Sequence, residues 1–257
     1  MPVADEEFED LCFQYGVELE FGDAEEMQMN RVDGEGGNID ISKEIVYKIE
    51  VAANRYDLLC LEGIATAFRT YLDLGRLPKY TVKNQSDDLM EIVVKPDVAD
   101  VRPFVVGCVL RDIKFDIKSY NSFIDLQDKL HHNICRRREL ASMGTHDLDK
   151  ITGRQITYHA VPPTEIQFQA LKQKDSMNAV ELFEVFKDDN KMKKFLPIIQ
   201  HFDAYPVFHD ESGQVLSLPP IINSEHTKIT LDTTNVFVEI TGTDIMKTKI
   251  CLAILAA

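Results

Sequence analysis

Several side chains of this 257-residue chain have types and spacings that suit metal binding or hydrolysis. His131 and Cys135 lie four residues apart, which would place two metal ligands on one face of a helix, but two further ligands are not evident nearby. We therefore favour a structural role for this pair and expect no metal site. The sequence contains neither a Gly-x-Ser-x-Gly nucleophile elbow nor a His-Glu-x-x-His zinc motif, so neither standard hydrolase mechanism is indicated.

Two basic clusters could contact phosphate groups. The first, Arg136, Arg137 and Arg138, follows an amphipathic stretch, where positive charge either offsets a helix dipole or contacts nucleic acid. The residues alone leave both interpretations open. The second cluster falls on a predicted helix, where such a run is usually a solvated face, and consists of Lys191, Lys193 and Lys194.

Hydrophobic periodicity predicts helices and short strands in an α+β arrangement. The helices are expected over residues 5–15, 54–72, 119–140 and 179–196, with a last helix after Asp244. The strands are expected over residues 45–51, 89–94 and 104–110, and near Val207, Val215, Ile229 and Val236.

Composition and charge set broad limits on the function. A hydrophobic content of 44% is enough for a buried core. The net charge is −15, of which residues 1–44 supply −12, so the remainder is close to neutral and a polyanionic partner stays possible. Residues 22–38 are acidic and rich in glycine. We expect a mobile loop there rather than a phosphate cradle, because no strand precedes them and no helix follows.

The cysteines and the ends of the chain indicate an intracellular protein. Five widely spaced cysteines without a Cys-x-x-Cys pair predict reduced thiols in the cytoplasm. The first residues lack the features of a signal peptide, and the apolar tail over residues 250–257 is too short to span a bilayer, so we expect no membrane contact. The abrupt apolar end predicts that the chain is a fragment.

Three segments carry a more specific pattern. The first is IEVAANRYDLLCLEGIA from Ile49 to Ala65, and the second is MGTHDLD from Met143 to Asp149. The third joins LSLPPIINSEH from Leu216 to His226 with NVFVEITGTD from Asn235 to Asp244. These segments resemble the phenylalanyl-tRNA synthetase beta subunit family in its archaeal and eukaryotic form, and the resemblance covers nearly the whole chain.

The resemblance implies a domain order and a set of partners. Residues 1–85 would form a small helical domain, and residues 86–257 a mixed α/β editing domain with mostly antiparallel short strands, truncated at its end. The family's catalytic alpha subunit would join through missing later parts in a heterotetramer. ATP and magnesium would serve the full enzyme, whereas this fragment would need no cofactor.

The resemblance also implies a phenylalanine-tRNA ligase subunit whose editing domain hydrolyses tyrosine mischarged onto phenylalanine tRNA. Such a second sieve is useful because an apolar pocket excludes an added hydroxyl poorly. Glu239 would accept a hydrogen bond from the tyrosine hydroxyl, although periodicity alone favours a solvent-facing strand residue. A positioned water would attack the ester. The implied substrate-binding residues are Ser217, Glu239 and Thr241, the catalytic residues are Thr145, His146 and Asn223, and the tRNA-binding residues are Arg136, Arg137 and Arg138.

Two alternatives stay open. Thr241 and Thr243 flank a glycine and could simply cap the final helix. The whole region could also be a noncatalytic scaffold that orients the tRNA and the partner subunit.

Overall fold

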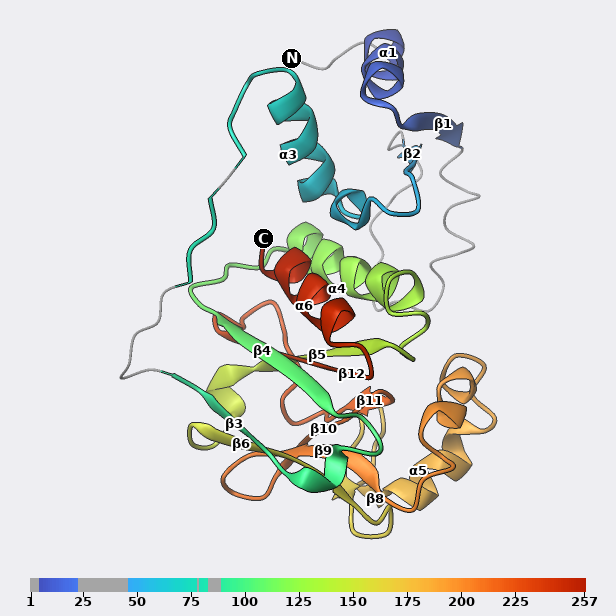
Figure 1. Ribbon diagram of the computed structural model, residues 1–257, viewed down its shortest axis with the longest axis vertical. Helices are drawn as coiled ribbons and strands as arrows, with labels where there is room; N and C mark the ends of the chain where they lie inside the picture. Colours follow the sequence, from blue (N-terminus) through green and yellow to red (C-terminus); the bar gives the residue numbers. More distant parts are fainter. Residues whose placement is uncertain (1–4, 23–45, 78, 83–88) are drawn as a thin grey trace. The chain divides into compact units, whose positions relative to one another are not determined.

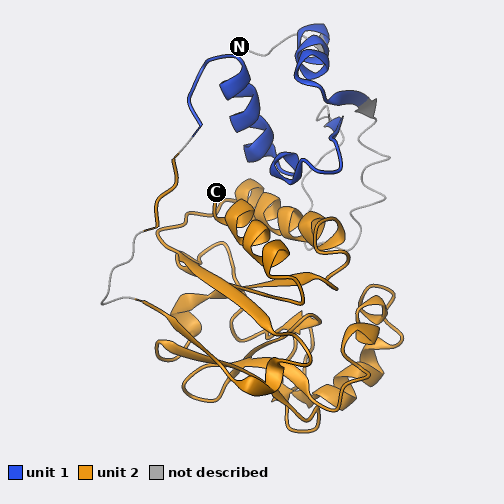
Figure 2. Ribbon diagram, viewed as in Figure 1, with its two compact units in different colours: residues 1–78 blue, residues 79–257 orange. Residues whose placement is uncertain are grey.

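The computed structural model describes residues 5–22, 46–77, 79–82 and 89–257, and its contacts divide the chain into two units, Met1–Pro78 and Lys79–Ala257 (Figure 2). The boundary expected near residue 85 lies outside the described residues. The loop expected over residues 22–38 also lies outside them, except for Gly22 at the end of a strand.

The described residues of the first unit form two helices and a two-stranded antiparallel sheet (Figure 1). Its elements are α1 (Asp5–Tyr15), β1 (Glu18–Gly22), β2 (Val46–Glu50), the 3-10 turn η1 (Tyr56–Leu58) and α3 (Leu61–Tyr71). The strand β1 is an element that the periodicity did not predict. Helix α1 ends as expected at Gly16, whose φ of 93° is available to glycine without strain. The helix expected from residue 54 begins only at Leu61, because the Cys60 side chain caps it by accepting the Gly63 N–H.

The second unit has two packed sheets, with helices covering the outer face of the smaller one (Figure 1). The smaller sheet is antiparallel in the order β4-β12-β5 and comprises β4 (Phe104–Leu110), β5 (Ala141–Asp147) and β12 (Val236–Gly242). Helices α4 (Ile117–His132) and α6 (Ile245–Ala256) pack on it. The strand predicted over residues 104–110 is therefore confirmed.

The larger sheet has the order β11-β10-β9-β6-β3, and only β3 and β6 pair in parallel. Its strands are β3 (Glu91–Val94), β6 (Gln155–Val161), β9 (Tyr205–His209), β10 (Val215–Leu218) and β11 (Ile222–Asn223). Mostly antiparallel short strands are thus confirmed. The prediction of a strand near Ile229 is wrong, because that residue lies in an irregular segment between β11 and β12.

Among the described residues, two buried clusters pack on the two faces of the larger sheet. Phe237 of the smaller sheet packs between the sheets with Tyr158, Phe208 and Leu216 of the larger one. The second cluster covers the other side of the larger sheet and includes α5 (Ala179–Phe186), which follows the short pair β7 (Gln167–Phe168) and β8 (Met177–Asn178). The helix predicted over residues 179–196 ends at Phe186, and only the 3-10 turns η5 (Met192–Lys194) and η6 (Leu196–Ile198) follow it.

The helix predicted over residues 119–140 also ends early, at His132. Arg136, Arg137 and Arg138 have φ values of 47°, 54° and 70°, and three successive left-handed residues cannot continue a right-handed helix. These arginines therefore lie beyond the helix, in the turn that follows it.

The five cysteines are free thiols, as predicted. Among the described residues, no helix combines the length and the hydrophobicity needed to cross a bilayer.

Candidate functional site

Glu239 lies in the middle of β12, the central strand of the smaller sheet, and only 2% of it is exposed. The residues opposite it on both neighbouring strands are glycines, Gly107 on β4 and Gly144 on β5. A methyl group added at Gly144 would collide with the Glu239 carboxylate. The Glu239 carboxylate can therefore occupy this position only because Gly144 has no side chain. The solvent-facing position that periodicity favours is wrong, because both faces of β12 are covered.

The carboxylate is only half satisfied. Ser217 of β10 donates its hydroxyl to Glu239 Oε1 at 3.0 Å, whereas Oε2 is buried without a hydrogen-bond partner. His146 Nε2 lies 3.9 Å from Oε1 and is also buried without a partner, while Nδ1 of the same ring is 2.8 Å from Thr227 Oγ1. Two buried polar atoms without hydrogen-bond partners destabilise the fold unless a ligand supplies the missing hydrogen bonds.

A buried arginine contacts β12 at Thr241, two residues after Glu239. Arg102 is 1% exposed, and it donates from Nε to Thr241 Oγ1 at 2.9 Å and from Nη2 to the Thr241 carbonyl at 3.0 Å. Burial lowers the pKa of the Arg102 guanidinium to about 10, although the electrostatic attraction of Tyr158 and Glu239 acts in the opposite sense. Thr241 therefore orients Arg102.

The helix-cap alternative for Thr241 is wrong. The cap of α6 is Asp244, whose Oδ1 accepts from the Met246 and Lys247 N–H groups. Thr243 instead donates its hydroxyl to the Glu139 carbonyl at 3.3 Å.

The structure separates Thr145 from His146. Successive strand residues point to opposite faces, and the Thr145 hydroxyl reaches Gln127 of α4 at 3.4 Å, away from Glu239. Thr145 and His146, which the resemblance implies to be catalytic together, therefore do not direct their side chains to the same place. Asn223 lies at the edge of β5, where its Nδ2 donates to the Thr145 carbonyl at 3.4 Å.

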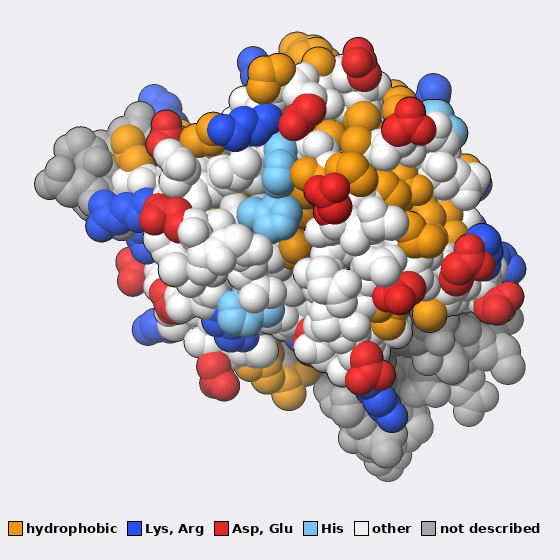
Figure 3. All heavy atoms as spheres, turned by 90° about the horizontal axis from the view of Figure 1, so that it is seen from below, with side chains coloured by type: hydrophobic (Ala, Val, Ile, Leu, Met, Phe, Trp, Pro, Cys, Tyr) orange, Lys and Arg blue, Asp and Glu red, His pale blue; other side chains and the backbone are white. Residues whose placement is uncertain are grey.

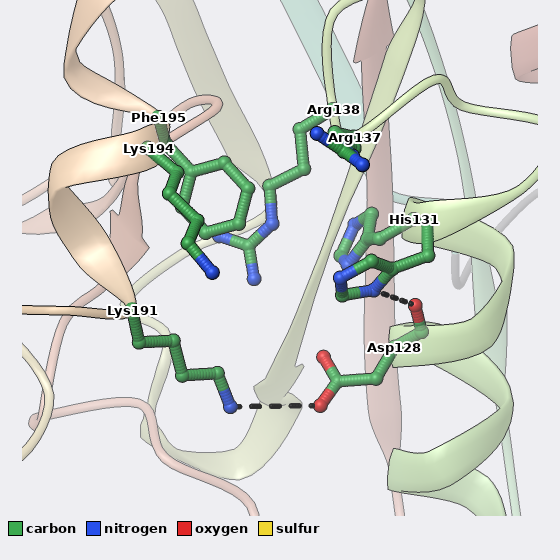
Figure 4. Close-up of a pocket in the computed structure, with 8 residues that line it drawn as sticks. Asp128, His131, Arg137, Arg138, Lys191, Lys194 and Phe195 are labelled. Carbon is green, nitrogen blue, oxygen red and sulfur yellow. Dashed lines mark hydrogen bonds and ion pairs between the residues drawn. The ribbon is translucent and has the colours of Figure 1, made fainter.

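The three arginines predicted to bind tRNA have different surroundings. Arg136 and Arg137 are exposed, whereas Arg138 packs into the protein, with its Cζ 4.2 Å from the centroid of the Phe195 ring. Arg137 and Arg138 line a small hollow (Figure 4). The other lining residues are Asp128, His131, His132, Lys191, Lys194 and Phe195.

The suspected metal ligands do not form a metal site. His131 Nε2 accepts a hydrogen bond from the Met143 N–H at 2.8 Å, and Cys135 Sγ lies 3.4 Å from Cys251 Sγ. Nowhere in the described parts of the chain do three or more metal-binding side chains come together.

A pair of histidines lies outside both sites. His159 Nε2 and His209 Nδ1 are 2.8 Å apart on the neighbouring strands β6 and β9. Figure 3, which views the molecule from below Figure 1, shows histidine side chains gathered beside a broad group of hydrophobic ones.

Comparisons with known proteins decide the family. Residues 1–74 match the model of the Phe-tRNA synthetase beta subunit B1 domain, and residues 109–254 match the model of the B3/4 domain. A crystal structure of an N-terminal fragment of the phenylalanyl-tRNA synthetase beta subunit from Pyrococcus horikoshii aligns with a TM-score of 0.81 and 32% identity, over 98% of this chain and 67% of that one. The chain belongs to the phenylalanyl-tRNA synthetase beta subunit family.

Full-length relatives are similar over nearly the whole chain. The phenylalanine-tRNA ligase beta subunit named cytoplasmic from Arabidopsis thaliana is 51% identical over 96% of this chain, and the beta subunit from Mus musculus is 46% identical over 98%. The alignments cover 41% and 42% of these relatives, so the chain spans about two fifths of their length. It corresponds to the N-terminal region of a phenylalanyl-tRNA synthetase beta subunit.

Within this family member, the predicted residues gather only in part. His146, Ser217 and Glu239 meet at one point, Thr241 lies two residues along the same strand, and Asn223 lies beside β5. Arg102 is the residue that sequence reasoning missed. The sequence around Arg102, a single arginine before a proline, does not predict its burial, which is seen only in the folded structure.

Proposed function

We propose that the second unit is an editing domain that hydrolyses tyrosine mischarged onto phenylalanine tRNA. The observation that supports this most directly is the buried Glu239 carboxylate with one oxygen unpartnered, next to the unpartnered Nε2 of His146. A phenol hydroxyl donates one hydrogen bond and accepts another, so it suits a carboxylate and an imidazole N–H together.

The same geometry explains selectivity against phenylalanine. Tyrosine gives Glu239 Oε2 the donor that it lacks. Phenylalanine has no hydroxyl and would leave Oε2 unpartnered, so its complex would lack a stabilisation of about 1–3 kcal/mol, or roughly five- to 150-fold in rate. A correctly charged tRNA is therefore spared.

In the hydrolysis, a positioned water attacks the ester carbonyl. The bond between the carbonyl carbon and the ribose oxygen breaks, and the ribose oxygen takes up the proton that the water loses. The products are free tyrosine and uncharged tRNA. Ser217 donates its hydroxyl to Glu239 and so holds the carboxylate in place. His146, Thr145 and Asn223 stay the candidates for positioning the water and the ester.

The proposal extends to the enzyme that contains this region. Its later parts join an alpha subunit in a heterotetramer, and that enzyme uses ATP and magnesium to charge tRNA in the cytoplasm. The editing step itself needs no cofactor, because hydrolysis of an activated ester requires only water and its positioning.

The test is the release of tyrosine from tyrosyl-tRNA made with phenylalanine tRNA, measured with the alpha–beta enzyme that contains this chain. Release well above the buffer rate, together with slow release from phenylalanyl-tRNA, is the expected result. A buffer-level rate for both substrates, with tRNA binding intact, would favour the noncatalytic scaffold.

A further inference from the structure

The hollow beside Arg138 concentrates positive charge in an acidic chain. It lies between the end of α4, the left-handed turn that follows, and the segment around η5. Figure 4 shows the side chains of Lys191, Lys194 and Arg138 directed into one space opposite α4. Four cationic side chains line it against one carboxylate, that of Asp128, which pairs with Lys191 at 3.7 Å. Lys194 and Arg137 have no ion pair among the described residues.

Arg138 presents an unused donor edge to this space. Its Nη1 donates to the Ile221 carbonyl at 2.9 Å and to the Pro220 carbonyl at 3.3 Å, and the guanidinium stacks on Phe195. Its Nε is buried without a partner, and the hydrogen bonds that its side chain donates to described residues both come from Nη1. Nε and Nη2 point to the same side of the guanidinium, and that pair binds an oxyanion with two parallel hydrogen bonds.

His131 supplies a second unused donor. Its Nε2 accepts from the Met143 N–H, so the neutral ring carries its proton on Nδ1. Nδ1 is buried without a partner, and the whole residue is 5% exposed. Burial keeps the ring neutral by lowering the pKa of His131 well below its ordinary value, and the charge of Arg138 adds to this effect. Two residues that line this positive hollow therefore each have a buried donor without an acceptor, and an anion would complement both donors.

We propose that this hollow binds one backbone phosphate of a single-stranded RNA end. Arg138 Nε and Nη2 hold two phosphate oxygens, and Arg137 and Lys194 neutralise the charge. The choice of RNA rests on the proposed function, whereas the anion site does not. A further exposed cation, Arg136, precedes Arg137 in the chain, which suits a chain of phosphates better than one free ion.

The position of the hollow links it to the Glu239 site. Arg138 is bonded to the turn at residues 220 and 221, directly after β10, which carries Ser217. The Arg138 carbonyl also accepts from Arg102, which holds Thr241. A phosphate at Arg138 would thus be held against the elements that form the editing site. This assigns the hollow a positioning role for the end of the tRNA.

The test compares two neighbouring lysines on one turn. Lys194 lines the hollow, whereas Lys193 does not, and its Nζ instead donates to Asn190 Oδ1 at 2.7 Å. Fluorescence anisotropy measures the binding of a labelled single-stranded RNA oligonucleotide to the full chain over a range of salt concentrations. Lys194→Gln should weaken binding about five- to tenfold and reduce the slope of log K against log salt by about 0.7. Lys193→Gln should change the affinity less than twofold.

A second variant and a competitor complete the test. Arg137→Gln/Lys194→Gln should reduce the slope by about 1.4, as expected for two lost phosphate contacts on a single strand. Millimolar inorganic phosphate should displace the RNA from the wild type. Equal losses for Lys193→Gln and Lys194→Gln would overturn the proposal in favour of a diffuse positive surface. Inorganic phosphate that binds as tightly as the RNA would overturn RNA as the occupant.

This outcome is independent of editing. RNA binding is measured without a charged tRNA, so a failure of tyrosine release leaves the binding comparison intact. If editing is present, Lys194→Gln should raise the tyrosyl-tRNA concentration needed for half-maximal release and leave the maximal rate unchanged. A fall in the maximal rate alone would contradict the positioning role.

Discussion

Replacing Glu239 is the sharpest test of the proposal that its carboxylate accepts a hydrogen bond from the tyrosine hydroxyl. The carboxylate accepts one hydrogen bond from Ser217 and has a second oxygen free, so a bound tyrosine would add one charge-assisted hydrogen bond. Such a bond contributes about 1.5–3 kcal/mol, which corresponds to roughly ten- to 150-fold in rate. Glu239→Ala should slow tyrosine release by that factor. Glu239→Gln keeps the shape and a neutral acceptor, and should lose roughly five- to 30-fold.

The assay is deacylation of tyrosyl-tRNA and phenylalanyl-tRNA under identical conditions, with thermal melting of every variant to verify folding. The ratio of the two rates is the decisive number, because a variant that merely loosens the fold slows both substrates. Glu165→Gln makes the same chemical change at an exposed glutamate of the same unit and should leave the ratio unaltered. Equal ratios for wild type and Glu239→Ala would refute Glu239 as the hydroxyl reader.

Three further outcomes are expected. Gly144→Ala places a methyl group against the Glu239 carboxylate and should slow tyrosine release at least about tenfold while RNA binding is retained. An unchanged rate would contradict the need for a glycine opposite Glu239. Arg102→Lys keeps the charge but loses most of its hydrogen bonds, and urea unfolding should show a loss of about 2–4 kcal/mol. Burial lowers the pKa of both His159 and His209 in the folded state, so the unfolded chain binds more protons below about pH 6.5, and stability should fall as the pH falls through that value. His159→Gln should flatten this fall in a melting series from about pH 8 to pH 5, and an equally steep fall would contradict the assignment.

Sequence periodicity predicted those elements that are defined by their own residues. The strand β4 matches its predicted bounds, and α4 starts close to its predicted position because Asp116 and Ser119 form a capping box within the segment itself. The end of α4 could not be predicted in the same way. The left-handed turn after it is stabilised by contacts of Arg138 with the Ile221 carbonyl and the Phe195 ring, which are more than 50 residues away in the chain.

The site was harder to predict from periodicity than the fold. All seven residues of β12 are buried, so the strand carries no alternation from which the orientation of Glu239 could be inferred. The family resemblance supplied Glu239, Ser217 and His146 as candidates, and the structure places them together. It could not supply the separation of Thr145 from His146, because the periodicity predicted no strand over residues 141–147, and it is the strand β5 that directs successive side chains to opposite faces.

The row of residues across the smaller sheet bears on the choice between a binding site and a scaffold, on energetic grounds. Glycine within a strand weakens a sheet, and Gly107 and Gly144 flank Glu239 on both sides. The carboxylate between them is buried with an unpartnered oxygen, which adds a further cost to folding. A domain that only oriented other molecules would be more stable with apolar residues at these three positions. A ligand that brings a hydroxyl to Glu239 Oε2 offsets the cost when it binds, and the glycines leave the carboxylate free to meet it. The arrangement therefore favours the proposed recognition site over the noncatalytic scaffold.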